Sequence, residues 1–365
     1  MLKTLNKLKK PDFNLLITTL ILTIFGIIMV YNASVAEANQ LFGDKYYFLK
    51  LQLKWVLIGY LGLIGAMIIP LNWLKKIAWP SLVLTLILLI LVLIPGIGNS
   101  ALGARRWMNI GPFNLQPSEL SKLTLSLYLA AWLTKNRPFG LYLLILGVVL
   151  GLIMLQPDLG TAIVVIFSSI LVYYVSGANW IYLSLLSIIG GLTGIGLILS
   201  SPYRKARLLT FFDPTRDPLG SSYHIRQALI AIGSGGLFGL GLGQSRQKYQ
   251  FLPQVATDSI FAVVAEELGF LGGTLVLIIF CWLIYKCFNV ARTATDDFTR
   301  LLAVGISSWL ATQSFLNFAA MLALVPLTGV PLPFISYGGS SLVFALTGIG
   351  LLLNISRYRS NLIKK

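Results

Sequence analysis

Ten runs of predominantly apolar residues recur along the chain, and most are about 20 residues long. A helix needs about 20 apolar residues to cross the hydrocarbon core of a bilayer. The runs lie at about 14–33, 51–70, 78–96, 118–134, 141–156, 160–177, 180–200, 266–285, 301–325 and 340–356. Only 11% of the residues are charged, whereas soluble domains have about 25%. We therefore expect an all-α polytopic membrane protein with ten transmembrane helices.

The net charge of +16 does not indicate a nucleic-acid partner. A basic patch on a polar surface is typical of such proteins, but here the basic residues are scattered over an apolar chain. Cys281 and Cys287 lie in one apolar run and have no metal or redox spacing, so we interpret them as packing residues. His224 is the single histidine, so we expect neither a histidine-based metal site nor a catalytic triad.

The distribution of Lys and Arg predicts the orientation. An even number of spans places both termini on one side, and that side carries fifteen of the 28 basic residues. The short loops and helix mouths opposite carry six, and the other seven lie in one long loop. Because cytoplasmic loops are enriched in Lys and Arg, we expect cytoplasmic termini. The chain then forms a single transmembrane domain, 1–365, with a large external loop at about 201–260, between spans seven and eight.

Part of that external loop, residues 230–243, is apolar but too short and too rich in glycine for an ordinary span. Irregular backbone at membrane depth must pack against protein or line a wet cavity. We expect an interfacial or re-entrant segment, in which Gly239–Gly243 serves as a flexible joint.

Ionisable residues within spans are costly, so each one is a candidate for function. Glu119 and Lys122 stand three residues apart at the external mouth of the fourth span, on one helix face. The alternative is a structural pair at a helix start. Asp158 lies in a second polar corner on the same side, between spans five and six, where a simple turn is the alternative.

Asp258 directly precedes the eighth span, where Thr257 could cap the helix and leave Asp258 in its first turn. Glu266 and Glu267 follow two turns later, and we expect external basic residues as their partners. The segment 336–341 precedes the tenth span and could form an anion-binding nest of amides.

Gln313 and Asn317, one turn apart in the ninth span, are expected to form interhelical hydrogen bonds. Basic residues also occur in the external loop, although Lys and Arg are usually enriched in cytoplasmic loops. They are Arg204, Lys205, Arg207, Arg246 and Lys248. Such cations suit a phosphate-bearing, lipid-linked substrate, and a carboxylate among them could take a proton from an incoming hydroxyl. The residues alone therefore indicate an outward-facing site for an anionic amphiphile and do not name a reaction.

Three segments resemble the signatures of the SEDS family, the FtsW/RodA/SpoVE group of bacterial cell-wall polymerases. They are 103–119 (GARRWMNIGPFNLQPSE), 156–161 (QPDLGT) and 331–341 (PLPFISYGGSS). The resemblance covers essentially the whole chain. Segments 209–214, 230–236 and 243–248 are closer to FtsW, the division branch, than to RodA, the elongation branch.

This resemblance implies a peptidoglycan glycosyltransferase that polymerises lipid II outside the bacterial cytoplasmic membrane. The essential acidic residue of the family falls on Asp258, which is implied as the catalytic base of an inverting transfer. Ala256 and Ser259 depart from the family pattern, which usually has His and Phe there. Glu119 and Lys122 match functionally important family residues. The expected substrate-binding residues are Glu119, Lys122, Arg105, Asp158, Arg204, Arg207, Arg246, Lys248 and Ser340.

The resemblance also implies partners and a cofactor. A class B penicillin-binding protein with transpeptidase activity is the expected partner, together with other division proteins. A divalent cation, Mg²⁺ or Mn²⁺, is implied by the family, although no ligand set is legible in the sequence. Two other functions stay open: a flippase that moves lipid II outward, and a non-catalytic scaffold for the transpeptidase.

Overall fold

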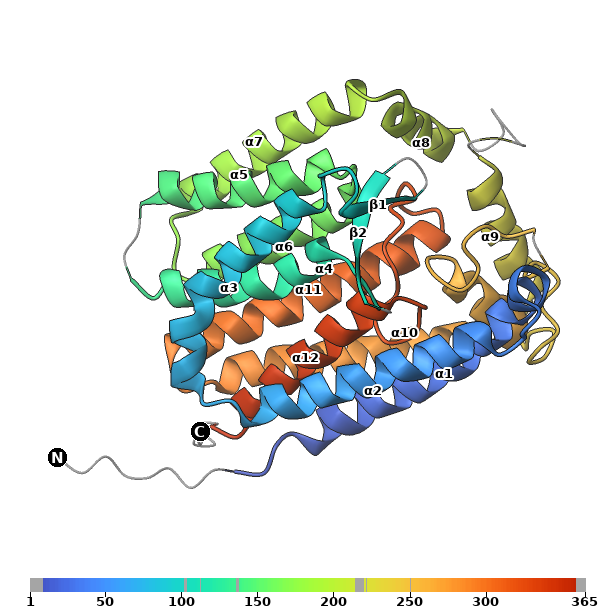
Figure 1. The fold of residues 1–365 in the computed structure, drawn as a ribbon, viewed down its shortest axis with the longest axis horizontal. Coiled ribbons are helices and arrows are strands. Elements are labelled where there is room, and N and C mark those ends of the chain that lie inside the picture. The colour runs from blue at the N-terminus through green and yellow to red at the C-terminus, as the bar shows by residue number, and fades with distance from the viewer. Residues whose placement is uncertain are drawn as a thin grey trace.

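The computed structural model describes residues 9–101, 104–111, 113–135, 138–213, 220, 222–249 and 251–358. Most of these residues are helical (Figure 1). The helices that follow the expected spans are α1 (Phe13–Phe42), α2 (Tyr47–Ile68), α3 (Leu71–Leu91), α4 (Pro117–Trp132), α5 (Phe139–Leu155), α6 (Leu159–Val175), α7 (Trp180–Leu199), α10 (Ile260–Thr293), α11 (Asp297–Met321) and α12 (Gly339–Ser356). Each of the ten expected ranges thus coincides with a helix.

Six of these helices, α1, α2, α3, α10, α11 and α12, are long and apolar enough to cross a membrane. Shorter apolar stretches form α5 (Phe139–Leu155), α6 (Leu159–Val175) and the part of α7 from Trp180 to Gly196. This pattern makes the chain a multi-pass membrane protein, because exposed apolar helices of this length need lipid around them.

Helix α11 lies at the centre of the bundle, and 83% of its most apolar 18-residue stretch is buried inside the protein. It packs against α4, α6 and α10, whereas α12 packs along α2 (Figure 1). Gly350 permits the α2–α12 contact, because a side chain there would collide with the backbone of Leu63. The core therefore places α4 and α11, which carry Lys122 and Gln313, side by side.

A small antiparallel sheet corrects the expectation of an all-α protein. Strands β1 (Gly98–Ala101), β2 (Ala104–Ile110) and β3 (Phe113–Leu115) pair in the order β1-β2-β3 between α3 and α4. The segment is too polar for a span, so its backbone groups pair across strands instead. Gly111, with φ of 60°, supplies the left-handed conformation that the β2–β3 turn requires.

The external loop is not one irregular segment, because it contains α8 (Pro202–Phe212) and α9 (Tyr223–Ser234). After α9, the amides of Leu240 and Gly241 donate to the carbonyls of Glu266 and Glu267, each at 3.0 Å. These bonds form next to the interruption of α10 at Gly269, where φ is 67°. In this structure the stretch Gly239–Gly243, expected to be a flexible joint, is hydrogen-bonded to α10.

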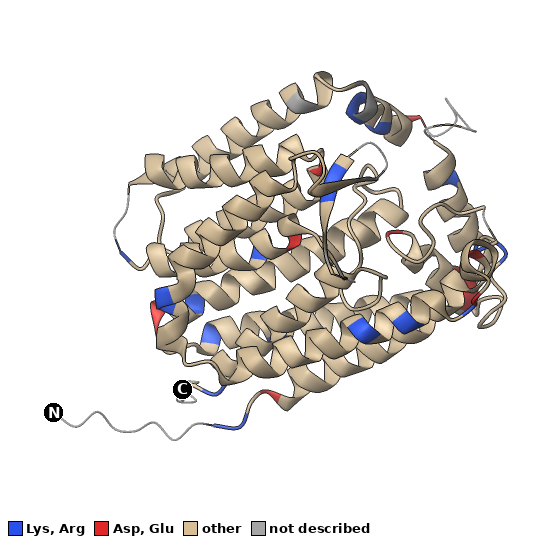
Figure 2. Ribbon diagram, viewed as in Figure 1, with Lys and Arg blue, Asp and Glu red and all other residues tan. Residues whose placement is uncertain are grey.

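The two ends of the described chain lie together. The Lys9 amide donates to the Arg357 carbonyl at 3.0 Å, and the Asp12 amide donates to Ser356 Oγ at 3.0 Å. This agrees with the expectation that both termini share one side. Figure 2 shows charged residues at both ends of the bundle and others in its middle. Several residues used for the orientation, such as Lys3 and Lys365, lie outside the described residues.

Candidate functional site

Asp258 lies on a turn that ends one residue before α10 begins. The amides of Thr257 and Ser259 both donate to the carbonyl of Gln254, at 3.1 and 3.3 Å. Ser259 is the N-cap of α10, and Thr257 Oγ1 bonds to Gln254 instead of capping the helix. The expectation that Thr257 caps the helix and that Asp258 lies in its first turn is therefore wrong. The turn holds the partly exposed Asp258 ahead of the helix.

Other elements clamp this turn from the protein side. Asn317 Nδ2 of α11 donates to the Asp258 carbonyl at 2.8 Å. Ser336 Oγ donates to the Thr257 carbonyl at 2.6 Å, and the Tyr337 amide donates to the Ala256 carbonyl at 2.8 Å. Because these bonds use main-chain atoms of the turn, the Asp258 carboxylate stays available.

In the segment 336–341, expected to form an anion-binding nest, two backbone amides are already hydrogen-bonded within the protein. The Ser336 amide donates to Leu332 at 3.0 Å, and the Tyr337 amide is also committed, as described above. Ser340 Oγ accepts from the Gln116 amide at 3.0 Å and donates to the Asn114 carbonyl at 2.9 Å. In this structure Ser340 therefore joins α12 to β3 and the start of α4.

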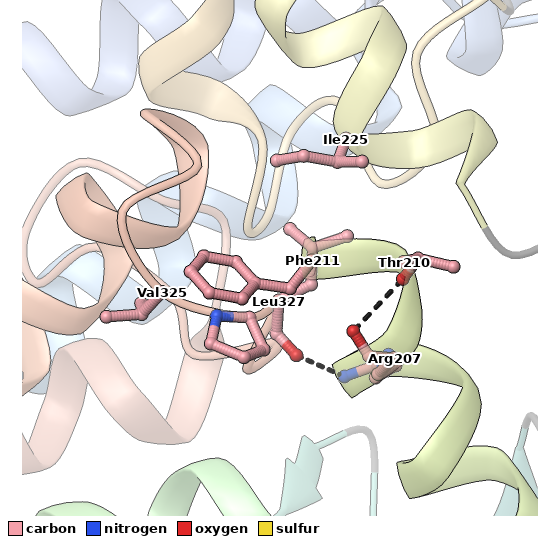
Figure 3. A pocket seen from close by; sticks show the side chains of 7 residues that line it. Arg207, Thr210, Phe211, Ile225, Val325 and Leu327 are labelled. Carbon is pink, nitrogen blue, oxygen red and sulfur yellow. Dashed lines mark hydrogen bonds between the residues drawn. The ribbon is translucent and has the colours of Figure 1, made fainter. Parts of the chain in front are cut away.

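Arg207 of α8 approaches the loop between α11 and α12. Its Nη1 donates to the Leu327 carbonyl at 2.8 Å. It lines a small pocket that is otherwise mostly apolar (Figure 3). The lining residues are Arg207, Thr210, Phe211, Ile225, Val325, Pro326 and Leu327. In the same loop, a side chain on Gly329 would begin 3.5 Å from Asp258 Oδ2. A cation, apolar side chains and a carboxylate thus lie around one loop.

His224 of α9 also belongs to this region. Its Nε2 lies 2.6 Å from Ser259 Oγ. Burial lowers the pKa of His224; the negative charge of Asp258 opposes this shift, and Arg207 adds to it. The sequence interpretation missed His224, because a single histidine has no spacing signal and its neighbour is 35 positions away.

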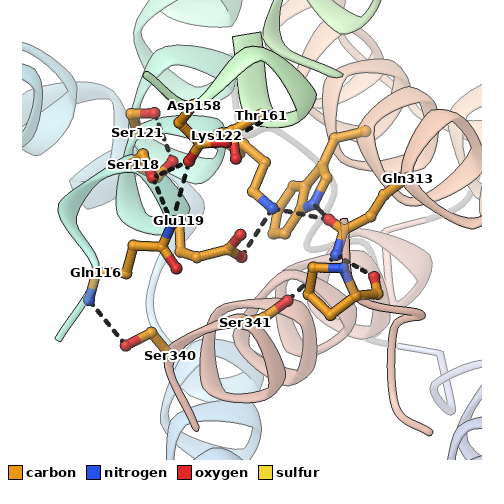
Figure 4. A network of polar contacts seen from close by, with 12 residues as sticks. Gln116, Ser118, Glu119, Ser121, Lys122, Asp158, Thr161, Gln313, Ser340 and Ser341 are labelled. Atoms are coloured by element: carbon orange, nitrogen blue, oxygen red, sulfur yellow. Dashed lines mark hydrogen bonds and ion pairs between the residues drawn. The ribbon is translucent and has the colours of Figure 1, made fainter. Parts of the chain in front are cut away.

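Glu119 and Lys122 form a buried ion pair in α4 (Figure 4). Lys122 Nζ lies 2.7 Å from Glu119 Oε2 and donates to Gln313 Oε1 at 2.7 Å. It also lies 5.5 Å from the centre of the Trp309 ring. The Lys122 side chain is 1% exposed, so a phosphate can reach its ammonium only if the neighbouring side chains move.

Asp158 lies beside this pair and caps α6. Its Oδ1 accepts from the Thr161 amide at 3.2 Å, and its Oδ2 accepts from Gln116 Nε2 and Ser118 Oγ, each at 3.1 Å. These bonds join the α5–α6 corner to the first turn of α4. Arg106 Nε, which the sequence interpretation did not select, donates to the Gln156 carbonyl of the same corner at 2.9 Å.

Gln313 and Asn317 connect the buried pair with the Asp258 turn. Gln313 Nε2 donates to the Pro331 carbonyl at 2.9 Å, and Asn317 Nδ2 donates to the Val330 carbonyl at 2.8 Å as well as to Asp258. The two side chains stand one turn apart on α11. The expected interhelical hydrogen bond is confirmed for Gln313, which accepts from Lys122 of α4, whereas Asn317 bonds to carbonyls of a turn and a loop. One face of α11 therefore links Lys122 to the main chain of Asp258.

Lys248 forms a third polar group. Its Nζ donates to Asn32 Oδ1 at 2.8 Å and to the Gly243 carbonyl at 2.7 Å, and pairs with Glu267 at 3.1 Å. Glu266 accepts from the Arg246 amide at 3.0 Å. The expectation of basic partners is thus confirmed for Glu267, whereas Glu266 takes an amide and a hydroxyl.

The remaining expected site residues lie elsewhere. Arg246 has an exposed side chain, and Arg204 is partly buried in α8. Arg105 is exposed on β2, with Nη1 3.5 Å from the Leu93 carbonyl. The structure therefore gathers Asp258, Arg207 and His224 in one place, Glu119, Lys122 and Asp158 in a second, and Lys248 in a third.

No group of three or more His, Cys, Asp or Glu side chains in the described part of the chain is placed to hold a metal ion. Divalent hard cations take six or more oxygen ligands. The groups around Asp258 are a guanidinium, an imidazole and backbone carbonyls, which do not fit that requirement. We therefore derive no step through a metal.

These features define a polytopic membrane protein with a carboxylate on a hydrogen-bonded turn and a buried ion pair connected to that turn through α11. A family model described as "Cell cycle protein", FtsW/RodA/SpoVE, matches residues 13–361. The chain therefore belongs to the FtsW/RodA/SpoVE family.

Curated relatives and solved structures agree with this family. The stage V sporulation protein E of Bacillus subtilis is 42% identical, over 96% of this chain and 98% of its own. A probable peptidoglycan glycosyltransferase FtsW of Geobacter is 40% identical, over 94% and 96%. A chain from a peptidoglycan synthase complex that coordinates polymerization and crosslinking matches with a TM-score of 0.79 and 31% identity, over 96% and 99%. The rod shape determining protein RodA of Thermus thermophilus matches with a TM-score of 0.71 and 31% identity, over 96% and 97%.

Proposed function

We propose that this chain is a peptidoglycan glycosyltransferase that polymerises lipid II into glycan strands. Relatives that match nearly the whole chain carry the name of this activity. The observation that carries the proposal is the Asp258 carboxylate, held on a hydrogen-bonded turn with Arg207 and an apolar pocket beside the same loop. Such a site suits a substrate with a lipid tail, a pyrophosphate and sugar hydroxyls.

Asp258 acts as the general base in this proposal. It takes the proton from the 4-hydroxyl of the acceptor sugar as that oxygen bonds to the anomeric carbon of the donor. The bond from the anomeric carbon to the phosphate oxygen breaks, and undecaprenyl pyrophosphate leaves with the electron pair. The anomeric centre is inverted. Arg207 and Arg204, on successive turns of α8, offset the charge that develops on the leaving group.

Glu119 and Lys122 act through other residues in this proposal. Because Lys122 is enclosed, it holds Gln313, which in turn holds the Pro331 carbonyl beside the Asp258 turn. Asp158 and Ser340 fix the start of α4 in the same way. The pair thus maintains the geometry of the base in the described state, and contact with pyrophosphate would require movement of Glu119 or Gln313.

The topology is part of the proposal. We place ten helices across the bacterial cytoplasmic membrane, with both termini in the cytoplasm and the Asp258 turn outside, as one domain over 1–365. The contact between Lys9 and Arg357 supports termini on one side. The excess of basic residues on the terminal side supports a cytoplasmic location.

A transpeptidase is the proposed partner. The similar solved chain belongs to a complex that coordinates polymerization and crosslinking. We propose that this chain works with a class B penicillin-binding protein and with other division proteins. A divalent cation, Mg²⁺ or Mn²⁺, is proposed to bind the pyrophosphate, whose oxygens supply ligands that the described residues lack.

Purified protein with lipid II, with and without the transpeptidase, tests the function. We expect glycan polymer on a gel from the wild type, and loss of polymer from Asp258→Asn, which keeps the shape but cannot take a proton. Asp44→Asn, at an exposed carboxylate, is the matched control and should keep full activity. Polymer from Asp258→Asn at the wild-type rate would refute the catalytic assignment. Lipid II movement across liposomes without polymer would favour the flippase.

A further inference from the structure

The single histidine joins α9 to the residue that follows Asp258. His224 Nε2 lies 2.6 Å from Ser259 Oγ, and Ser259 Oγ lies 2.8 Å from the carbonyl oxygen of Pro253. Ser259 is fully buried, and it is the N-cap of α10. One hydroxyl therefore contacts α9, the start of the Asp258 turn and the start of α10.

The direction of these hydrogen bonds follows from the chemistry of the three groups. A carbonyl oxygen can only accept, so the Ser259 hydroxyl donates its one proton to Pro253. The contact with His224 then needs a donor on the ring, so Nε2 carries a hydrogen. The order of donation is His224 to Ser259 to Pro253.

The bond from His224 exists in both protonation states of the ring. Burial lowers the pKa of His224, with Asp258 acting against the shift and Arg207 with it, which favours the neutral ring. A neutral ring protonated at Nε2 donates to Ser259, and so does an imidazolium. The contact is therefore a permanent one, and it does not switch with pH.

The rest of the turn is held from the opposite side. Asn317 of α11 and Ser336 fix the carbonyls of Asp258 and Thr257. On the α9 side, the side-chain hydrogen bond from His224 contacts the residue next to Asp258. Without it, the buried Ser259 oxygen would lose its donor, and the turn would be anchored from the α11 side alone.

We propose that His224 is a positioning residue for Asp258, which fixes the turn from Pro253 to Ser259 and thereby the direction of the Asp258 carboxylate. Its kinetic consequence rests on the proposed glycosyltransferase function, whereas its structural consequence does not. The two are therefore tested by separate measurements.

Hydrogen exchange measured by mass spectrometry tests the positioning without any substrate. In His224→Leu, which cannot donate, the amides of Thr257 and Ser259 should exchange about tenfold faster than in the wild type. In His224→Gln, whose amide can donate, they should stay within about twofold. Ser259→Ala removes the same bond without a bulky side chain and should behave like His224→Leu. Ser234→Ala, at the far end of α9, is the control. Wild-type exchange in both His224→Leu and Ser259→Ala would overturn the proposal.

Lipid II polymerisation tests the kinetic consequence. His224→Leu should lower kcat by about 10- to 100-fold with KM nearly unchanged, because small misplacements of a catalytic group are costly. His224→Gln should recover most of the rate, and Ser259→Ala added to His224→Leu should cause no further loss. If the wild type polymerises and His224→Leu matches it, the positioning role is wrong. If the wild type is inactive but the exchange results hold, the proposed function fails and the positioning of the turn stands.

Discussion

Two buried lysine–glutamate pairs lie in different parts of this molecule, and their neighbours differ. Lys122 and Glu119 are three residues apart on α4, with side chains 1% and 3% exposed. Lys248 and Glu267 join the external loop to α10, with side chains 2% and 0% exposed. Burial of such a pair costs several kcal/mol per ion before the attraction offsets it, so burial alone does not distinguish their roles.

The partners distinguish them. Lys122 bonds to Gln313, which leads through α11 to the main chain of Asp258. Lys248 bonds to the Gly243 carbonyl and to Asn32 of α1, so it fastens the glycine-rich turn to two helices. We infer that the first pair maintains the geometry of the Asp258 turn, whereas the second maintains the conformation of the external loop.

The largest effect is expected for Lys122→Met. It leaves Glu119 buried without a cation, which should cost about 3–5 kcal/mol of stability. Polymerisation should fall by more than about 100-fold, because Gln313 keeps only its hydrogen bond from Trp309 and the support of the Asp258 turn is weakened. Thermal unfolding in detergent and the lipid II assay measure the two effects. The double variant Glu119→Gln/Lys122→Met removes both charges and should recover stability but not activity; recovery of both would make the pair purely structural.

Lys248→Met should destabilise the protein as strongly, by about 3–5 kcal/mol, because Glu267 is equally buried. The activity of the protein that remains folded should fall by less than about tenfold. Polymerisation per folded molecule, measured after size-exclusion chromatography, checks this. A loss as large as that of Lys122→Met would mean that Lys248 contacts the substrate, as the family resemblance implies.

A smaller effect is expected for Asn317→Ala, which interrupts the connection between the Glu119–Lys122 pair and the Asp258 turn. The carbonyls of Asp258 and Val330 lose their common donor, which should cost about 1–3 kcal/mol. The value of kcat should fall about tenfold while KM is retained, since the base is displaced but the pocket remains. Ser314→Ala, whose hydroxyl bonds within α11, is the control. An equal loss in that control would assign the effect to general helix destabilisation.

The smallest effect is expected for Lys50→Ala, at an exposed pair. The hydrogen bond from Lys50 lowers the pKa of Asp44. A carboxyl group whose pKa is lowered on folding stabilises the folded state at pH values above its ordinary pKa. This stabilisation is lost as the pH falls through the lowered pKa. Solvent screens such a pair, so the unfolding midpoint at neutral pH should not change. A measurable shift would contradict the expectation that the exposed Lys50–Asp44 pair contributes far less stability than the two buried pairs.

Much of the helical layout could be predicted, because a bilayer forces apolar runs of fixed length. The polar face of α11 was also predictable, since Gln313 and Asn317 stand one turn apart in an apolar span. The β1–β3 sheet was not expected, because its residues carry no long apolar run. The short contact between His224 and Ser259 depends on how α9 folds back onto α10, which no local spacing reveals. For the same reason, the sequence did not show that two cations of the long loop, Arg207 and Lys248, lie in different polar groups.

The contact between α2 and α12 bears on biosynthesis. Asn354 Nδ2 donates to the carbonyls of Ala66 and Ile69 at 3.0 and 2.6 Å, and Gly350 lies against the Leu63 backbone. Helix α2 is synthesised long before α12, so the face of α2 that packs on α12 is covered only after α12 has been made. A chain that stops before residue 339 should therefore expose this apolar face of α2, with the carbonyls of Ala66 and Ile69 left without the donor that Asn354 supplies.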